Sequence, residues 1–576
     1  MLKRILSLLL LTVLLLTAVS CSFRKTGSET TGATTAIIEE PTDPLDVGDA
    51  IARLSEKNVA IGRTDLVYDL TRDEVDRLLA DFDELDRLLA DATDYAAFDD
   101  LYTRLSEDGI DRIRTQTEII YIFWCCDLSD TKTEAAYLYL NELYSDLGAR
   151  VNRMYETIWN SAFRDDFFDG WTDEEIAYAR ACAAGSTDEM TALDAENAEL
   201  LAAFRALSDE DDSFYPESAR LFLEMAKNND RIAELFGYEN YMDYAYPEIY
   251  GRDYSPADAA ALRALFCEYL SAPLSDLAAR ANADQLAFTA LSFSDYFKFY
   301  NYVLGDVRSD YINVVDRYAA AVGEITPDYL STYRDFWDKK CYYYAKGDAY
   351  EGAFTTYLPD FETPVIYFGP GYFATDTFVH EFGHYFAAAL SEDGGDSLPY
   401  DLAETQSQGD EFLFAYWFEY IEPSYVEVAH AVAEYKIYDV LTSILTASLV
   451  NDFETYVYTH LDALTPEDLD GVLVSLCDAY GGYDAVKAAL GYEPEIYWHH
   501  VVMEAPGYYV SYAASAIPTL ALYATAKTEG FRAAVEAYSV IVTADPEAGF
   551  LAALDEAGIG SPFERDTYAA ILAAIE

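Results

Sequence analysis

Two histidines four residues apart are the most informative feature of this sequence. His380 and His384 lie in the run FVHEFGHYFAAAL at residues 378–390, and residues four apart on a helix share one face. Both imidazoles can then reach one divalent metal ion, and Glu381 beside the first can reach water at that metal. With six histidines among 576 residues, chance would place H-E-x-x-H in this chain only about 0.005 times. The pattern therefore predicts a catalytic zinc site in which Glu381 accepts a proton from water at the metal.

A catalytic zinc takes three protein ligands and keeps a fourth position open, so a third ligand must come from another element. The run ETQSQGDE at 404–411 supplies one. Glu404, Ser407 and Glu411 stand at i, i+3 and i+7, which is one stripe of a helix. We expect Glu404 to bind the metal and the other end of the stripe, with Ser407 and Glu411, to brace a histidine from behind.

The cysteines do not suggest a structural zinc site or a disulfide framework. Such zinc sites are usually closed by four protein ligands, often cysteines, and no C-x-x-C spacing occurs here. Beyond Cys21 the chain has Cys125, Cys126, Cys182, Cys267, Cys341 and Cys477, none of them near the histidine pair. Most should be small buried hydrophobic side chains, and one or two bridges stay open as an alternative.

Helical signals dominate the elements that must position these residues. Capping-box patterns at Thr71 with Glu74 and at Thr172 with Glu175 predict two helix starts, and Ser255-Pro256 predicts a third. The almost wholly apolar stretch 118–126 predicts a buried helix.

Strand signals are few and short. The best candidate is TPVIYF at 363–368, which Gly369-Pro370-Gly371 closes. It is either an edge strand that pairs with an extended peptide or one arm of a plain hairpin. The fold class predicted from the residues is mainly α with a small β-sheet.

Charge excludes one class of partner. The chain is 52% hydrophobic and long enough for two to four domains, and its formal net charge is -66. Such acidity repels nucleic-acid phosphates and anionic membrane surfaces. We therefore expect no nucleic-acid partner, and at most a weak preference for basic peptides.

The first residues read as an export signal. Lys3 and Arg4 precede an apolar run that is too short to cross a bilayer, and small residues stand before Cys21. The order Ala-Val-Ser-Cys resembles the lipobox of bacterial lipoproteins, which implies that residues 1–20 are removed and Cys21 is lipidated. The alternative is an ordinary cleavable signal peptide that lies beside a cysteine. Residues 21–45, rich in Ser, Thr and Gly, then form a flexible tether.

The combination H-E-F-G-H followed by E-x-x-S-x-x-x-E resembles the M3 peptidases, the thimet oligopeptidase and oligoendopeptidase F group. The likeness extends to the segment GAFTTYLPDFETPVIYF at 352–368, to RIAELFGY at 231–238, and to HVVMEAPGYYVSYAAS near the C-terminal end. It begins at about residue 221, and the stretch 48–212 carries no motif that we can place.

The resemblance implies a role for each matching position. His380, His384 and Glu404 would bind one Zn²⁺ per chain, and Glu381 would act as general base and acid. His500, Tyr509 and Tyr512 would stabilise the oxyanion or hold substrate on a mobile active-site loop.

The resemblance also implies an architecture and a substrate class. We expect a helical two-lobed zincin metallopeptidase with a deep substrate channel, in which 46–212 form an N-terminal helical region and 213–576 the catalytic domain. Its substrates would be short unfolded peptides cut at internal bonds. The protein would be exported and anchored by lipid at the bacterial cell envelope, on the outer face of the cytoplasmic membrane or the periplasmic side, with a monomer favoured. A metallocarboxypeptidase and a peptide-binding protein without catalysis are the alternatives.

Overall fold

A computed structural model describes most of the chain. The residues described are 43–48, 54, 60–61, 66–205, 207, 213–282, 310–345, 349–350, 352–370, 375–391, 394–395, 398–421, 426–545 and 548–576. The predicted export signal, Cys21 and most of the predicted tether lie outside them. The chain divides into two compact units, which are Met1–Ser186 with Asp335–Phe373 and Thr187–Arg334 with Ala374–Glu576. The domain boundaries expected from the sequence stay a prediction.

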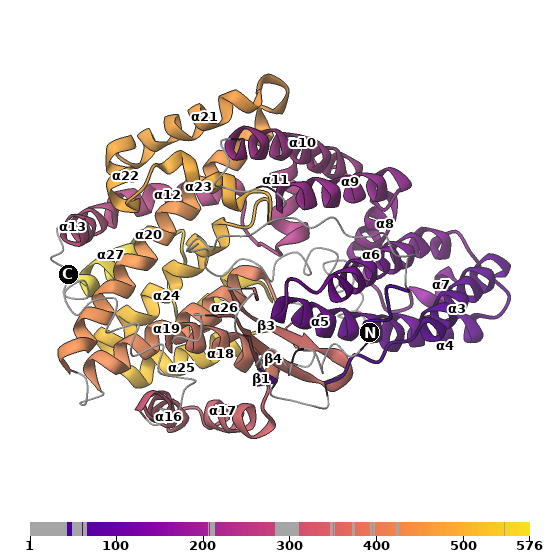
Figure 1. The fold of residues 1–576 in the computed structure, drawn as a ribbon, viewed down its shortest axis with the longest axis horizontal. Helices are drawn as coiled ribbons and strands as arrows, with labels where there is room; N and C mark the ends of the chain where they lie inside the picture. The colour runs from indigo at the N-terminus through magenta and orange to yellow at the C-terminus, as the bar shows by residue number, and fades with distance from the viewer. Residues whose placement is uncertain are drawn as a thin grey trace. The chain divides into compact units, whose positions relative to one another are not determined.

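Unit 1 consists of helices and one small sheet (Figure 1). Its helices are α3 (Arg72–Asp91), α4 (Tyr95–Arg104), α5 (Ile110–Cys126), α6 (Thr131–Trp159), α7 (Arg164–Phe167) and α8 (Asp173–Gly185), with the π-helical turn η1 (Leu105–Gly109) and the 3-10 turn η3 (Pro359–Phe361). Its strands are β1 (Ala60–Ile61), β2 (Tyr342–Tyr344), β3 (Ala353–Leu358) and β4 (Thr363–Phe368).

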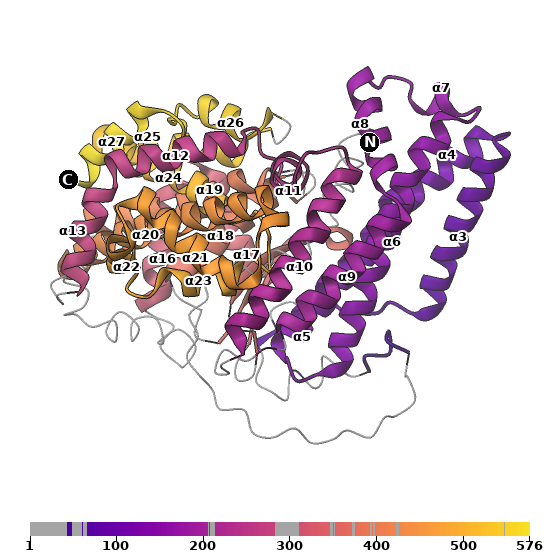
Figure 2. The ribbon, with the colours of Figure 1, turned by 90° about the horizontal axis from the view of Figure 1, so that it is seen from above.

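The predicted helix starts in this unit are confirmed. Thr71 caps α3, and Thr172 caps α8, each with its glutamate three residues on bonded back to the cap. The apolar stretch 118–126 lies in α5, which is buried along most of its length and packs against α6 and β3. Figure 2 shows α5 and α6 side by side.

The sheet has the strand order β1-β2-β4-β3, with β2 and β4 parallel and the other pairs antiparallel. Strand β4 spans the predicted residues Thr363–Phe368, and β3 joins it as a hairpin whose tight turn places Glu362 at φ +42°. The edge-strand alternative is wrong, because β4 has neighbours on both sides. All six of its residues are buried, as expected of an interior strand.

Unit 2 is built from helices in the part that the structure describes. They are α9 (Asp188–Arg205), α10 (Phe214–Leu235), α11 (Tyr241–Tyr244), α12 (Pro256–Tyr269), α13 (Ser271–Asn282), α16 (Asp310–Gly323), α17 (Pro327–Lys339), α18 (Thr375–Leu390), α19 (Tyr400–Tyr420), α20 (Val426–Thr459), α21 (Leu469–Leu476), α22 (Tyr483–Leu490), α23 (Pro494–Val501), α24 (Val510–Glu529), α25 (Phe531–Val542), α26 (Phe550–Glu556) and α27 (Arg565–Ile575). Shorter turns are η2 (Ala245–Ile249), η5 (Leu461–Ala463), η6 (Pro466–Asp468) and η7 (Cys477–Tyr480). The chain passes back to unit 1 within α17. The helix start predicted at Ser255-Pro256 is confirmed by α12.

Helix α19 is the centre of unit 2. It packs against α18, α20, α24 and α25, and Figure 1 shows these helices gathered around it. On α19, the fully buried Asp410 accepts hydrogen bonds from Tyr318 of α16 at 2.5 Å and from Tyr329 of α17 at 2.6 Å. Burial raises the pKa of Asp410 to about 7. Tyr329 also packs on Phe382 and Phe386 of α18, so α17 contacts both α18 and α19.

The predicted fold class, mainly α with a small sheet, is confirmed. All six cysteines beyond Cys21 are described, none forms a disulfide, and five are buried as expected. Among the described helices none is long and apolar enough to cross a membrane.

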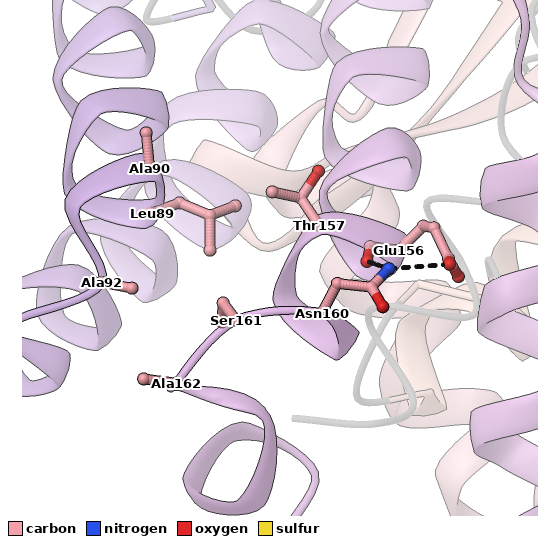
Figure 3. Close-up of a pocket in the computed structure, with 8 residues that line it drawn as sticks. All are labelled: Leu89, Ala90, Ala92, Glu156, Thr157, Asn160, Ser161 and Ala162. Atoms are coloured by element: carbon pink, nitrogen blue, oxygen red, sulfur yellow. Dashed lines mark hydrogen bonds between the residues drawn. The ribbon is translucent and has the colours of Figure 1, made fainter.

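Unit 1 also carries a hollow of about 590 Å³ (Figure 3). Its lining residues are Leu89, Ala90, Ala92, Glu156, Thr157, Asn160, Ser161 and Ala162. The single charged side chain, Glu156, accepts hydrogen bonds from Asn160 at 2.9 Å and from Arg180 at 2.9 Å. This hollow therefore holds no pair of groups suited to acid and base chemistry.

Candidate metal centre

Helix α18 presents the histidine pair as the sequence predicts. His380 and His384 lie one turn apart, with ring centroids separated by 5.0 Å and ring planes at 81°. Glu381, between them in the chain, is 1% exposed. The two rings are partly exposed, so the metal-facing side of the helix is not sealed.

Helix α19 brings Glu404 to this pair. The Oε2 atom of Glu404 is 3.8 Å from Nε2 of His380, and one ligand atom from each of His380, His384 and Glu404 lies within 4.8 Å of the others. Zinc bonds of about 2.0 to 2.2 Å to imidazole nitrogen and carboxylate oxygen fit a set of atoms this close. The donor set of two imidazoles and one carboxylate is that of a catalytic zinc with an open position.

A glycine makes this approach possible. A Cβ atom added at Gly383 would lie 2.8 Å from Cα of Ser407 and 2.9 Å from the carbonyl oxygen of Gln406. Both are backbone atoms of α19, which cannot move aside as a flexible side chain would. Gly383 therefore sets how closely α18 and α19 cross at the site.

Glu411 supports His380 from behind. Its Oε1 atom is 2.7 Å from Nδ1 of His380, and its Oε2 atom forms an ion pair with Lys436 of α20. Burial raises the pKa of Glu411, but Lys436 and His380 outweigh it and hold that pKa at about 2. The ionised carboxylate accepts a hydrogen bond from Nδ1–H of His380. The other ring nitrogen, Nε2, is then unprotonated and directs its lone pair toward Glu404 and the metal position.

His384 is also in the state that a metal ligand needs. Burial, with the adjacent His380, lowers the pKa of His384 to about 3, so its ring is neutral at pH 7. Ser407 donates to the backbone oxygen of Glu404 at 3.1 Å and lies 3.4 Å from Oε2. Glu411 therefore contacts a histidine as expected, whereas Ser407 contacts Glu404 instead.

Comparison with known proteins adds a family to this geometry. Residues 67–181 match the Peptidase M3 N-terminal domain, in the stretch where the sequence showed us no motif. A solved protein assigned as oligoendopeptidase F is similar over 90% of this chain and 98% of its own, with a TM-score of 0.67 at 18% identity. The resemblance to the M3 peptidases is confirmed.

Two further solved structures share this M3 fold. PZ peptidase A with an inhibitor has a TM-score of 0.65 at 16% identity, over 89% of this chain and 98% of that one. An oligoendopeptidase F assigned in Bacillus anthracis str. Ames has a TM-score of 0.62 at 16% identity, over 89% and 97%. No curated protein sequence matches the chain.

The segment before α24 contributes a residue that the sequence did not single out. Tyr508 donates a hydrogen bond from its hydroxyl to Oε1 of Glu404 at 2.7 Å. The M3 resemblance had pointed to its neighbours Tyr509 and Tyr512. With 50 tyrosines in the chain, composition carries no signal for Tyr508.

The predicted catalytic residues His500, Tyr509 and Tyr512 are placed less directly. Tyr512 has its ring centroid 5.3 Å from that of Tyr508, and the ring of Tyr509 is 5.6 Å from that of Tyr512. His500 stacks on Phe214 of α10 at 4.9 Å. Of the predicted tyrosines, Tyr512 thus has a ring contact with Tyr508, and the roles of His500, Tyr509 and Tyr512 stay predictions.

A second line of polar residues in unit 2 imitates a hydrolase triad. Nδ1 of His499 is 2.7 Å from Oγ of Ser218, and Nε2 is 2.9 Å from Oδ1 of Asp470. Ser218 is 1% exposed, inside the contact of α10 with α23. A nucleophile must reach substrate. These three residues therefore join helices rather than form an active site.

Proposed function

We propose that this protein is an extracytoplasmic zinc-dependent oligoendopeptidase that cuts internal bonds of short unfolded peptides. The observation that carries the proposal is the cluster of His380, His384 and Glu404, with the buried Glu381 beside the first histidine. The M3 fold supports it, and the solved relatives named above are oligoendopeptidases and PZ peptidase A.

His380, His384 and Glu404 would hold the zinc ion. When bound, zinc supplies Lewis acidity, which polarises a peptide carbonyl and makes water acidic enough to lose a proton near neutral pH. Glu381 takes that proton at a carboxylate oxygen as water attacks the carbonyl, and then donates it to the leaving amine. Tyr509, Tyr512 and His500 are proposed to stabilise the oxyanion or hold the peptide.

The proposed location depends on the N-terminal sequence. Lys3 and Arg4, the apolar run after them and the order Ala-Val-Ser-Cys support export and lipidation of Cys21. The tether 21–45 would then hold the folded body away from the membrane. Replacing Cys21 with Ser should release the protein from the membrane fraction and abolish incorporation of labelled fatty acid.

The activity is tested with an internally quenched peptide of about ten residues and a form of the protein without residues 1–21. Reactions contain zinc, or a chelator, or the Glu381→Gln variant, and mass spectrometry identifies the fragments. We expect internal cleavage that the chelator abolishes and that Glu381→Gln lowers by at least about 100-fold while zinc stays bound. Glu529→Gln, the same change at an exposed position of α24, is the matched control and should cleave normally.

Each other outcome points elsewhere. Release of single residues from one end would indicate a metallocarboxypeptidase. Zinc bound at one per chain without cleavage would indicate a peptide-binding protein. Loss of zinc from Glu381→Gln would mean that Glu381 is a ligand rather than the base.

A further inference from the structure

The short segment 506–511 is held by side chains from other parts of unit 2. The carbonyl oxygen of Pro506 accepts hydrogen bonds from Tyr250 at 2.6 Å and Tyr241 at 3.3 Å. The amide of Gly507 donates to Oε1 of the buried Glu454 at 2.7 Å. Gly507 has φ +78°, a conformation that a residue with a side chain rarely adopts. The backbone before α24 is therefore fixed at consecutive peptide groups.

Arg252 makes most of the remaining contacts with this segment. Its Nη1 donates to the carbonyl oxygen of Gly507 at 2.9 Å, and its Nη2 donates to that of Tyr508 at 3.0 Å and to Oγ of Ser511 at 2.8 Å. A planar guanidinium can bond several acceptors in a fixed relation, which a lysine ammonium cannot do as well.

Arg252 is itself rigidly placed. Its side chain is fully buried, and its guanidinium lies over the rings of Tyr246 at 4.5 Å and Tyr250 at 4.4 Å. A buried charge is costly unless it is paired and hydrogen-bonded. The backbone acceptors, the two rings and one carboxylate together meet this requirement.

That carboxylate belongs to the helix of the metal centre. Nε of Arg252 is 3.6 Å from Oδ1 of Asp401, which is fully buried in the first turn of α19 and three residues before Glu404. Among the described residues, neither Arg252 Nε nor the oxygens of Asp401 has a hydrogen-bond partner. The charge of Asp401 is therefore balanced across the 3.6 Å gap by Arg252.

One guanidinium thus contacts both sides of the hydrogen bond between Tyr508 and Glu404. It holds the backbone oxygen of Tyr508, whose hydroxyl is 2.7 Å from Oε1 of Glu404, and it pairs with Asp401 one turn before Glu404. The Tyr508 bond occupies Oε1, while Oε2 of Glu404 faces Nε2 of His380.

We infer that Arg252 is a positioning residue of the metal centre, which acts through Tyr508. By fixing the segment 506–511 it sets the Tyr508 hydroxyl on Oε1 of Glu404, and this turns Oε2 toward the metal. The inference rests on the proposed function in one respect, that Glu404 is a zinc ligand. Hydrogen bonds that orient metal ligands in this way typically account for 10- to 100-fold in metal affinity.

Zinc affinity, measured by competition with a chelating indicator, tests the inference without reference to peptide cleavage. We expect Tyr508→Phe to weaken zinc binding by about 10- to 100-fold. Arg252→Lys keeps the charge beside Asp401 and loses the forked contacts, and should weaken zinc binding in the same range. The double variant Tyr508→Phe/Arg252→Lys should bind zinc about as tightly as whichever single variant has the lower zinc affinity. Both changes remove the same hydrogen bond from Tyr508 to Glu404, so their effects should not add.

A matched control separates positioning from general loss of stability. Arg263→Lys changes a different arginine of unit 2, which is partly buried and pairs with Asp452 at 2.6 Å, and should leave zinc affinity unchanged. Each variant is checked by circular dichroism and urea unfolding. If Arg252→Lys fails to fold, Ser511→Ala removes one of the three hydrogen bonds from Arg252 to the segment 506–511 and should weaken zinc binding less, but in the same non-additive way with Tyr508→Phe.

Several results would overturn the inference. Unchanged zinc affinity in Tyr508→Phe would show that Oε1 of Glu404 needs no such support. Multiplying effects in the double variant would show that Arg252 acts by another route. A wild-type protein that binds zinc but cuts no peptide refutes the proposed function alone, whereas one that binds no zinc refutes both.

Discussion

At the scale of single residues, each metal-facing atom is oriented by a hydrogen bond to the second polar atom of the same side chain. His380 turns Nε2 toward the site because Glu411 holds Nδ1, and Glu404 turns Oε2 toward it because Tyr508 holds Oε1. The candidate ligands His380, His384 and Glu404 were predicted from their spacing together with the M3 resemblance. The residues that orient these side chains differ in how far they can be predicted. Glu411 lies on the same helix stripe as Glu404, whereas Tyr508 is about a hundred residues away in the sequence.

The buried acid under the segment 506–511 should make stability depend on pH. Burial raises the pKa of Glu454 to about 8, against bonds from Gly507 and the charge of Arg252 that lower it. The folded protein then keeps this proton up to about pH 8, while the unfolded chain loses it near pH 4.5. Stability from Glu454 is therefore complete below about pH 4.5 and is lost as pH rises toward 8, with a slope of up to about 1.4 kcal/mol per pH unit.

Glu454→Gln removes this titratable group, and the glutamine side-chain oxygen can still accept the hydrogen bond from the Gly507 amide. We expect the fall in unfolding free energy between pH 5 and pH 8, measured with urea, to be flatter in Glu454→Gln than in the wild type. Glu529→Gln, an exposed control, should follow the wild-type curve. Parallel curves for Glu454→Gln and wild type would show that Glu454 is ionised in the folded protein at neutral pH.

At the scale of elements, local signals predicted where helices and strands begin, but not what they contact. Thr71, Thr172 and Ser255 cap helices as expected, because a cap is completed by residues three positions away. The strand Thr363–Phe368 was also correct in its bounds; of its two alternatives, the edge strand is wrong and the hairpin arm is confirmed. In its parallel pairing with β2, Phe368 lies opposite Tyr344, which is 24 residues earlier in the chain. No local pattern encodes such a pairing.

The crossing of α18 with α19 gives the element scale its prediction. Gly383→Ala should push α18 away from the backbone of α19 at Ser407 and Gln406, because the new Cβ would lie within 3 Å of both. We expect about 1 to 3 kcal/mol of destabilisation, with weaker zinc binding as His380 and His384 move from Glu404. Urea unfolding and chelator competition measure the two effects.

Gly471→Ala is the matched control for that substitution. Gly471 lies in α21 with nothing within 4 Å of an added Cβ, so alanine should be neutral or stabilise the helix by about 0.5 to 1 kcal/mol. If Gly383→Ala keeps wild-type stability and zinc affinity, the helix crossing is not set by this contact.

At the scale of the whole molecule, the two units are not continuous stretches of chain. Residues 335–373 belong to unit 1, where β2 pairs with β1 of the N-terminal part, Ala60 opposite Tyr344. This arrangement could not be predicted from composition, because the crossing at 334–335 lies inside helix α17 and Gly369-Pro370-Gly371, next to the crossing at 373–374, also reads as an ordinary strand end. The acidity, by contrast, is counted from the whole sequence, so it can be known without the fold.

That acidity leads to a prediction about salt. Even if every Lys and Arg paired with one carboxylate, 66 of the 103 acidic residues would remain without a basic partner, so repulsion within the folded protein outweighs its ion pairs. Raising NaCl from about 10 mM to 0.5 M shortens the Debye length from about 30 Å to well under 10 Å. We expect the unfolding free energy in urea at pH 7 to rise on the order of 1 kcal/mol.

Potassium chloride at the same concentration should raise the unfolding free energy by the same amount, since screening depends on ionic strength. A fall in stability would show that the surface ion pairs dominate, and a difference between the two salts would indicate cation binding at particular carboxylates.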